Sequence, residues 1–267
     1  MDKTIARGAK TLFYRDEGDG LPVILLHGFA EDGSIWDKQA QQLKANHRLL
    51  IPDLPGSGRS SPLTGETSME KMAEDLLLLL DREDIQQCVL IGHSMGGYIG
   101  LAFAEKYPGR LKGLGLFHST AYADTEEKRS ARRKSIDFIQ KNGSSAFIRQ
   151  STPNLFAPET RNVHPELINE MIHRYSDFLP DSLVYYYEAM IRRPDRAAVL
   201  ERTKNPVLFV IGRHDQTVPP QQALQQSHLP ALSHIHILNH SAHAGMLEEP
   251  DQSYRFLQSY LNFVTQS

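Results

Sequence analysis

The sequence predicts an α/β protein with a mostly parallel, twisted central sheet flanked by helices. Several short apolar runs end in loops rich in Gly, Pro, Asp or His, and longer segments with helical spacing lie between them. Strands that are apolar on both faces are typical of a parallel sheet covered by helices on each side. We expect strands at residues 23–26, 49–51, 89–91, 114–117, 207–211 and 235–238.

The composition favours one large soluble domain. The 267 residues are 40% hydrophobic and 23% charged, which excludes a disordered or fibrous chain, and the net charge of −3 provides no positive field for nucleic acid. The single cysteine, Cys88, cannot form an internal disulfide, and the leucine run at 76–80 is too short to span a membrane. The first ten residues lack the apolar stretch of a secretory signal. We therefore expect a cytoplasmic monomer or homodimer with no nucleic-acid or membrane partner.

Three helices of the core can be predicted from the spacing of apolar residues. One spans 68–82 with Ser68 as its N-terminal cap, another spans 98–107 and stops at Pro108, and the last spans 251–264.

Residues 119–202 interrupt the alternation of strands and helices. This stretch has helical patterns, several prolines and no convincing apolar strand. We interpret it as a helical cap, or lid, inserted after the sixth strand over the carboxyl edge of the sheet, with 1–118 and 203–267 forming the core domain. Its charged segment EEKRSARRK at 126–134 is predicted to be a solvated helix face rather than a nucleic-acid patch.

The segment VLIGHSMGG at 89–97 carries the most specific chemical signal. It fits the G-x-S-x-G nucleophile elbow, with a strand before the motif and a helix after it. The tight turn holds the Ser94 hydroxyl above the sheet, and the Met95 amide N–H points into the same space. Ser94 is therefore the predicted nucleophile.

A serine hydroxyl needs a base, and the base needs an acid to orient it. Of the 12 histidines, His243 is favoured because it lies in a short loop before the last helix, and His240 is the alternative. Asp215, directly after the strand at 207–211, is the predicted acid. Asp124 is the alternative acid, although we interpret it as the cap of a helix beginning at Thr125.

An oxyanion would need two N–H donors. Met95 supplies one amide, and the loop His27-Gly28-Phe29 after an early strand supplies the other, for which we choose Phe29. We interpret His27 and His93 as structural residues.

With these motifs the chain resembles the α/β-hydrolase superfamily over nearly its whole length. The shared segments are HGF at 27–29, DLPGSGRS at 53–60, GRHDQTVP at 212–219 and HAGMLEEP at 243–250. The resemblance implies a catalytic triad of Ser94, Asp215 and His243, oxyanion amides at Phe29 and Met95, and no metal or organic cofactor. Asp53 is usually a structural loop residue in this family.

Within the superfamily the chain resembles 3-oxoadipate enol-lactone hydrolases, cofactor-free haloperoxidases and small carboxylesterases. A serine nucleophile implies attack on an acyl carbon, so we expect a serine hydrolase of esters, lactones or related small acyl substrates. The alternatives are a small-ligand receptor or signalling partner with little turnover, or a perhydrolase, C–C hydrolase or hydroxynitrile lyase. The predicted substrate pocket comprises Gly28, His118, Tyr122, Phe138 and Phe156.

Overall fold

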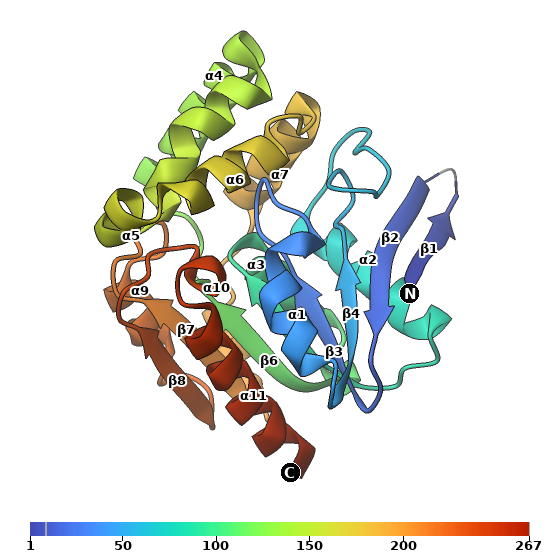
Figure 1. The fold of residues 1–267 in the computed structure, drawn as a ribbon. Helices are drawn as coiled ribbons and strands as arrows, with labels where there is room; N and C mark the ends of the chain where they lie inside the picture. Colours follow the sequence, from blue (N-terminus) through green and yellow to red (C-terminus); the bar gives the residue numbers. More distant parts are fainter. Residues whose placement is uncertain (9, 267) are drawn as a thin grey trace.

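A mixed sheet forms the centre of the molecule in the computed structural model, which describes residues 1–8 and 10–266 (Figure 1). Its eight strands in these residues run in the order β1-β2-β4-β3-β5-β6-β7-β8. β2 is antiparallel to β1 and to β4, and all other neighbours are parallel, as predicted. The strands are β1 (Asp2–Arg7), β2 (Lys10–Glu17), β3 (Leu21–Leu26), β4 (His47–Pro52), β5 (Cys88–His93), β6 (Leu111–Phe117), β7 (Val207–Gly212) and β8 (Ser233–Leu238).

The six apolar runs found in the sequence all lie in β3 to β8, which confirms those strand predictions. The runs do not include β1 and β2, the antiparallel strands at one end of the sheet. In β2 only the middle of the strand is buried, and its sequence KTLFYRDE mixes charged and apolar residues. A strand of this kind produces no continuous apolar run.

Helices cover both faces of the sheet. Figure 1 shows α1, α10 and α11 in front of the strands and α2 and α3 behind them. Residues 68–82 form α2 as predicted, and the Ser68 side chain accepts a hydrogen bond from the Lys71 N–H. The core helices are α1 (Asp37–Leu43), α2 (Met69–Arg82), α3 (Met95–Lys106), α9 (Pro220–Gln226), α10 (Gly245–Glu248) and α11 (Pro250–Gln266), with the 3-10 turns η1 (Gly33–Trp36) and η2 (Pro108–Arg110).

A group of helices follows β6 and lies beyond the carboxyl ends of the strands (Figure 1). The first of them, α4, is kinked at Gly143, whose φ of 82° is accessible to glycine but strained for other residues. Residues 118–206 contain no strand, in agreement with the predicted helical lid. Its elements are α4 (Glu126–Ser151), η3 (Thr152–Leu155), α5 (Pro158–Val163), α6 (Pro165–Tyr175), α7 (Pro180–Arg192) and α8 (Ala197–Arg202).

Alternate residues of the strands face two separate apolar clusters. Leu90 of β5 belongs to a cluster that also contains side chains of α2, α3 and the lid. Its neighbours Val89 and Ile91 belong to a second cluster with Trp36 and the apolar face of α11. The lid therefore shares a continuous core with one face of the sheet. No helix within residues 1–8 and 10–266 is both long and apolar enough to cross a membrane.

Candidate active site

A sharp turn between β5 and α3 presents Ser94 at the carboxyl edge of the sheet. Ser94 has φ 49° and ψ −113°, a strained conformation for a residue with a side chain. A Cβ at Gly92 would lie 2.2 Å from the Gly96 carbonyl carbon, and a Cβ at Gly96 would lie 2.6 Å from the His27 carbonyl oxygen. Only glycine fits at these two positions, so the geometry agrees with the predicted nucleophile elbow.

Asp215 and His243 meet just beyond the ends of β7 and β8. His243 Nδ1 lies 2.8 Å from Asp215 Oδ2, and Asp215 Oδ1 accepts hydrogen bonds from the backbone N–H groups of Thr217 and Val218 at 2.8 and 2.9 Å. Burial would raise the pKa of Asp215, but the adjacent His243 and His118 imidazoles together outweigh burial and hold that pKa below its ordinary value. The ionised carboxylate fixes a proton on Nδ1, which leaves Nε2 as the basic nitrogen.

Ser94 and His243 line one cavity of about 240 Å³ beneath the lid. Ser94 Oγ makes no hydrogen bond with any described residue, so the contact between this hydroxyl and the imidazole is not yet formed. Catalytic hydrogen bonds are often loose in ligand-free enzymes and tighten when substrate binds.

The amides predicted to hold an oxyanion are both available. Met95 is the first residue of α3, and Phe29 lies in the loop after β3 and lines the cavity with Ser94. Neither N–H donates to a protein acceptor among the described residues. A helix N-terminus carries a partial positive charge, so the start of α3 would help the Met95 N–H to stabilise an oxyanion.

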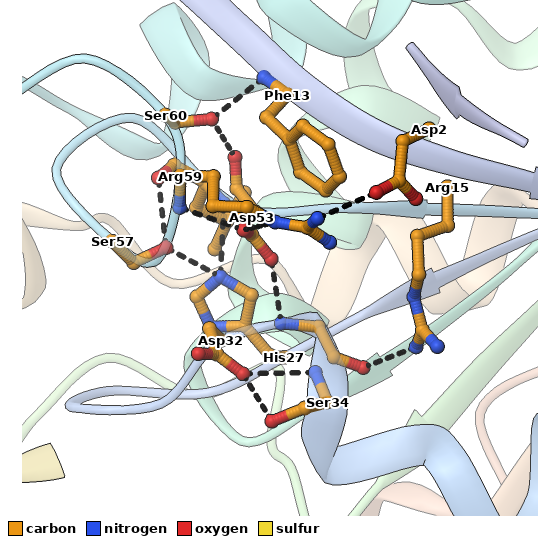
Figure 2. A network of polar contacts seen from close by, with 12 residues as sticks. Asp2, Phe13, Arg15, His27, Asp32, Ser34, Asp53, Ser57, Arg59 and Ser60 are labelled. Atoms are coloured by element: carbon orange, nitrogen blue, oxygen red, sulfur yellow. Dashed lines mark hydrogen bonds and ion pairs between the residues drawn. The ribbon is translucent and has the colours of Figure 1, made fainter. Parts of the chain in front are cut away.

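The loop that carries Phe29 is braced by polar contacts with the segment after β4 (Figure 2). His27 Nε2 accepts the Leu54 N–H at 2.9 Å and contacts Ser57 Oγ at 2.9 Å. Asp53 accepts the Gly33 N–H at 2.9 Å and the Arg59 N–H at 2.8 Å. These contacts agree with the structural interpretation of His27 and Asp53.

A buried pair, Glu31 and His93, connects three segments of the site. Glu31 Oε2 accepts the Gly28 N–H at 2.7 Å and lies 2.9 Å from His93 Nδ1, while His93 Nε2 lies 3.0 Å from the His243 carbonyl oxygen. With Glu31 ionised, both ring nitrogens face acceptors, and the doubly protonated imidazolium satisfies both contacts. Burial would lower the pKa of His93, but the Glu31 carboxylate, together with the His243 carbonyl and Asp215, outweighs burial and raises it.

The sequence predicts only a structural role for His93 and contains no signal that points to Glu31. In the structure both His93 ring nitrogens contact other groups, Glu31 and the His243 carbonyl oxygen, so this ring holds the backbone of the His243 loop. The N–H of His243 is held from the lid side, because it donates to the Leu155 carbonyl at 2.9 Å. The peptide groups around the candidate base are therefore fixed from two directions.

The alternative base and acid lie away from this arrangement. The His240 side chain is 72% exposed and faces Glu159 at 3.5 Å. Asp124 is fully buried between Arg132 and Arg193, at 2.6 and 2.9 Å. The prediction that Asp124 caps a helix was wrong, because the Thr125 side chain caps α4 by accepting the Lys128 N–H.

The five predicted pocket residues lie outside the lining of the cavity, for different reasons. Gly28 donates its N–H to Glu31, and Phe156 is packed in the lid core. His118 is completely buried behind Asp215, and its Nδ1 accepts the Gly212 N–H at 3.1 Å. Tyr122 contacts Arg193 through its carbonyl group, and Phe138 packs against the lid core.

The lining combines aromatic, aliphatic and polar side chains from the core and the lid. No three His, Cys, Asp or Glu side chains in residues 1–8 and 10–266 are grouped so as to hold a metal ion. The residues that line the cavity are Phe29, Ala30, Glu31, His93, Ser94, Tyr98, Arg132, Phe147, Ile148, Ser151, Thr152, Asn154, Leu155, Met171, Tyr187, Met190, Thr217 and His243.

This combination of sheet, elbow and lid defines a hydrolase fold. A family model for the alpha/beta hydrolase fold matches residues 22–250, and the chain belongs to that family.

Known proteins resemble the chain along almost its full length. An esterase from Thermogutta terrifontis, solved with malate bound, is 30% identical with a TM-score of 0.93 and 99% of each chain covered. A protein of Pseudomonas syringae, provisionally named carbamate hydrolase RutD, is 27% identical over 91% of this chain and 95% of its own length. The enol-lactonase of Burkholderia xenovorans shares the fold, with a TM-score of 0.90, 22% identity, and coverage of 97% of this chain and 100% of its own.

Proposed function

We propose that this protein is a serine hydrolase that cleaves carboxylic esters, lactones or related small acyl substrates through an acyl-enzyme intermediate. The observation that carries the proposal is the 2.8 Å contact between His243 Nδ1 and Asp215 Oδ2 beside a strained Ser94 in the same lid-covered site. The similarity to an esterase and to a provisionally named carbamate hydrolase supports acyl chemistry.

In the proposed mechanism, His243 Nε2 removes the Ser94 proton as Oγ attacks the substrate carbonyl carbon. The N–H groups of Phe29 and Met95 donate to the oxyanion that forms. Asp215 stabilises the imidazolium, which then donates its proton to the leaving alcohol or amine. Water attacks the acyl enzyme with His243 again acting as base, and the acid is released.

The first test is the variant Ser94→Ala. We expect it to reduce the turnover of 4-nitrophenyl acetate and butyrate by on the order of 10³-fold or more, because the residual rate comes only from binding and the oxyanion donors. A fluorophosphonate probe should label the unmodified protein but not the variant. Ser176→Ala is a suitable control, since the Ser176 hydroxyl bonds the Ile172 carbonyl outside the cavity lining.

The same experiment separates an enzyme from a ligand receptor on this fold. Many turnovers of at least one ester, lactone or carbamate, lost in Ser94→Ala, support the hydrolase. If the probe labels the protein but each ester, lactone and carbamate tested is turned over only once, the result would favour a receptor. Near-normal turnover in Ser94→Ala would overturn the assignment of the nucleophile.

A further inference from the structure

The lid brings a cation, Arg132 of α4, into the cavity that contains Ser94 and His243. It comes from the charged segment 126–134, most of whose charged side chains are exposed. The Arg132 side chain is only 12% exposed, and it lies with its guanidinium carbon 5.6 Å from the centre of the Tyr187 ring. A buried cation beside a candidate nucleophile is a candidate substrate contact.

The positive charge around Arg132 is only partly neutralised. Among the residues that the structure describes, Asp124 is the carboxylate within ion-pair distance of Arg132, and it also pairs with Arg193. Two guanidinium groups therefore share one carboxylate, which leaves one excess positive charge at this position.

Arg193 uses its donors on the protein itself. Its Nη1 donates to the Met190 carbonyl at 2.9 Å and its Nη2 donates to the Tyr122 carbonyl at 3.0 Å. The guanidinium also lies 3.9 Å from the centre of the Tyr98 ring, and the side chain is almost fully buried. Protein groups therefore satisfy the Arg193 donors, and we assign the excess positive charge to Arg132.

Arg132 has donors left over. Its Nε donates to Asp124 at 2.6 Å, and its Nη2 is 3.5 Å from the same carboxylate. Among the described residues its hydrogen bonds involve only Nε and Nη2, which leaves Nη1 without a partner on a side chain that lines the cavity. Glu31, an acidic side chain in the cavity lining, is already paired with His93 and Gly28. No acceptor in residues 1–8 and 10–266 therefore completes the planar set of contacts that the Arg132 guanidinium can make.

We propose that Arg132 is a specificity residue that binds a carboxylate on the acyl part of the substrate, so that the preferred substrates are half-esters or carboxylated lactones rather than neutral esters. This inference rests on the proposed serine hydrolase function. A guanidinium binds a carboxylate through two parallel N–H···O contacts, and a site shielded from water strengthens such contacts. The substrate would lie with its carbonyl at Ser94 and its carboxylate under the lid.

The test compares two substrates of similar shape. Mono-4-nitrophenyl glutarate carries the carboxylate, and 4-nitrophenyl 5-methylhexanoate has an isopropyl group in its place. Succinate and adipate half-esters extend the comparison to other chain lengths. We expect the unmodified protein to show a higher kcat/KM for the carboxylate at one length at least.

The variants are Arg132→Gln and the matched control Arg133→Gln, one residue further along α4. Arg133 is 55% exposed and pairs with Glu126, outside the cavity lining. Arg132→Gln should reduce the ratio of the two kcat/KM values by about 10- to 100-fold, the range for losing a charged hydrogen-bonded contact. Arg133→Gln should leave the ratio unchanged. Asp124 retains Arg193 in Arg132→Gln, which favours a folded variant.

A second measurement does not depend on turnover. Calorimetric titration with the glutarate dianion should show binding to the unmodified protein and about 10-fold weaker binding to Arg132→Gln. Arg132→Lys, which keeps the charge without the planar fork, should fall between them and provides a second variant if the glutamine variant does not fold. If the protein hydrolyses neutral esters, shows no preference for the carboxylate substrates and binds glutarate no better than Arg132→Gln does, this inference is wrong. The proposed hydrolase function would still stand. Arg132-dependent binding without any ester hydrolysis would instead overturn the proposed function.

Discussion

At the scale of single residues, the backbone around Asp215 determines what a substitution there would do. Its Oδ1 accepts the N–H groups of Thr217 and Val218, so only its other oxygen faces His243. An asparagine would place its carbonyl oxygen on those N–H groups and its NH₂ group against His243 Nδ1. The imidazole would then have to carry its proton on Nε2, where it could not accept the Ser94 proton.

Asp215→Asn should therefore reduce kcat by on the order of 10⁴-fold with little change in folding, as expected for a triad held in the wrong tautomer. The measurement is steady-state hydrolysis of 4-nitrophenyl butyrate, with thermal unfolding as the control for structure. A variant with more than a tenth of the normal kcat would show that this carboxylate does not orient the base.

Single residues also show what could be predicted from the sequence. Ser94, Asp215 and His243 each follow a recognisable strand, and parallel strands bring their carboxyl ends to one edge, so their proximity could be expected. No sequence motif marks Glu31 or Arg132. Glu31 pairs with His93, 62 residues away, and Arg132 pairs with Asp124, 8 residues away, beside a cavity that forms only when the lid packs on the core. Two of the predicted pocket residues, Phe138 and Phe156, lie in or against the lid core instead of the cavity, because aromatic spacing along a helix does not show which face of the helix lines a cavity.

At the scale of elements, three loops converge on the Glu31 and His93 pair. These are the loop after β3, the elbow after β5 and the loop after β8 that carries His243. Burial would raise the pKa of Glu31, but His93 together with the Gly28 N–H and His27 outweighs burial and holds that pKa below 4.5. Burial would lower the pKa of His93, but Glu31 together with the His243 carbonyl and Asp215 raises it above 6.5. His93 contributes its full stabilisation below about pH 6.5 and loses it as the pH rises through its raised pKa. Glu31 contributes above about pH 4.5 and loses its contribution as the pH falls through its lowered pKa.

Glu31→Gln should therefore destabilise the fold most between about pH 4.5 and 6.5, by about 1–3 kcal/mol, and the difference should shrink at higher pH. Urea unfolding at a series of pH values measures this. Glu166→Gln is the matched control, because Glu166 pairs with His164 at 2.9 Å on the surface, where such contacts contribute little. A pH-independent cost for Glu31→Gln would mean that the two groups are not charged together.

At the scale of the whole molecule, the lid and the sheet share one apolar cluster, while the opposite face of the sheet has its own. The sequence presents residues 119–202 as an insertion, but insertion in the chain does not show whether a segment unfolds by itself. Strand β5 contributes alternate side chains to both clusters, so packing on one face constrains the other. We infer from this packing that the lid and the core unfold in one cooperative transition.

Trp36, the only tryptophan of the chain, lies fully buried in the cluster opposite the lid and can report on that transition through its fluorescence. Leu183 of α7 is also fully buried, within the cluster that the lid shares with the sheet. Leu183→Ala should lower the free energy of unfolding measured at Trp36 by about 2–5 kcal/mol, because it leaves a cavity in a shared core. Leu179→Ala, at a position that is 48% exposed beside the same helix, should change it by less than about 0.5 kcal/mol. If Leu183→Ala instead leaves the Trp36 transition unchanged while protease digestion of the lid becomes faster, the lid unfolds independently of the sheet.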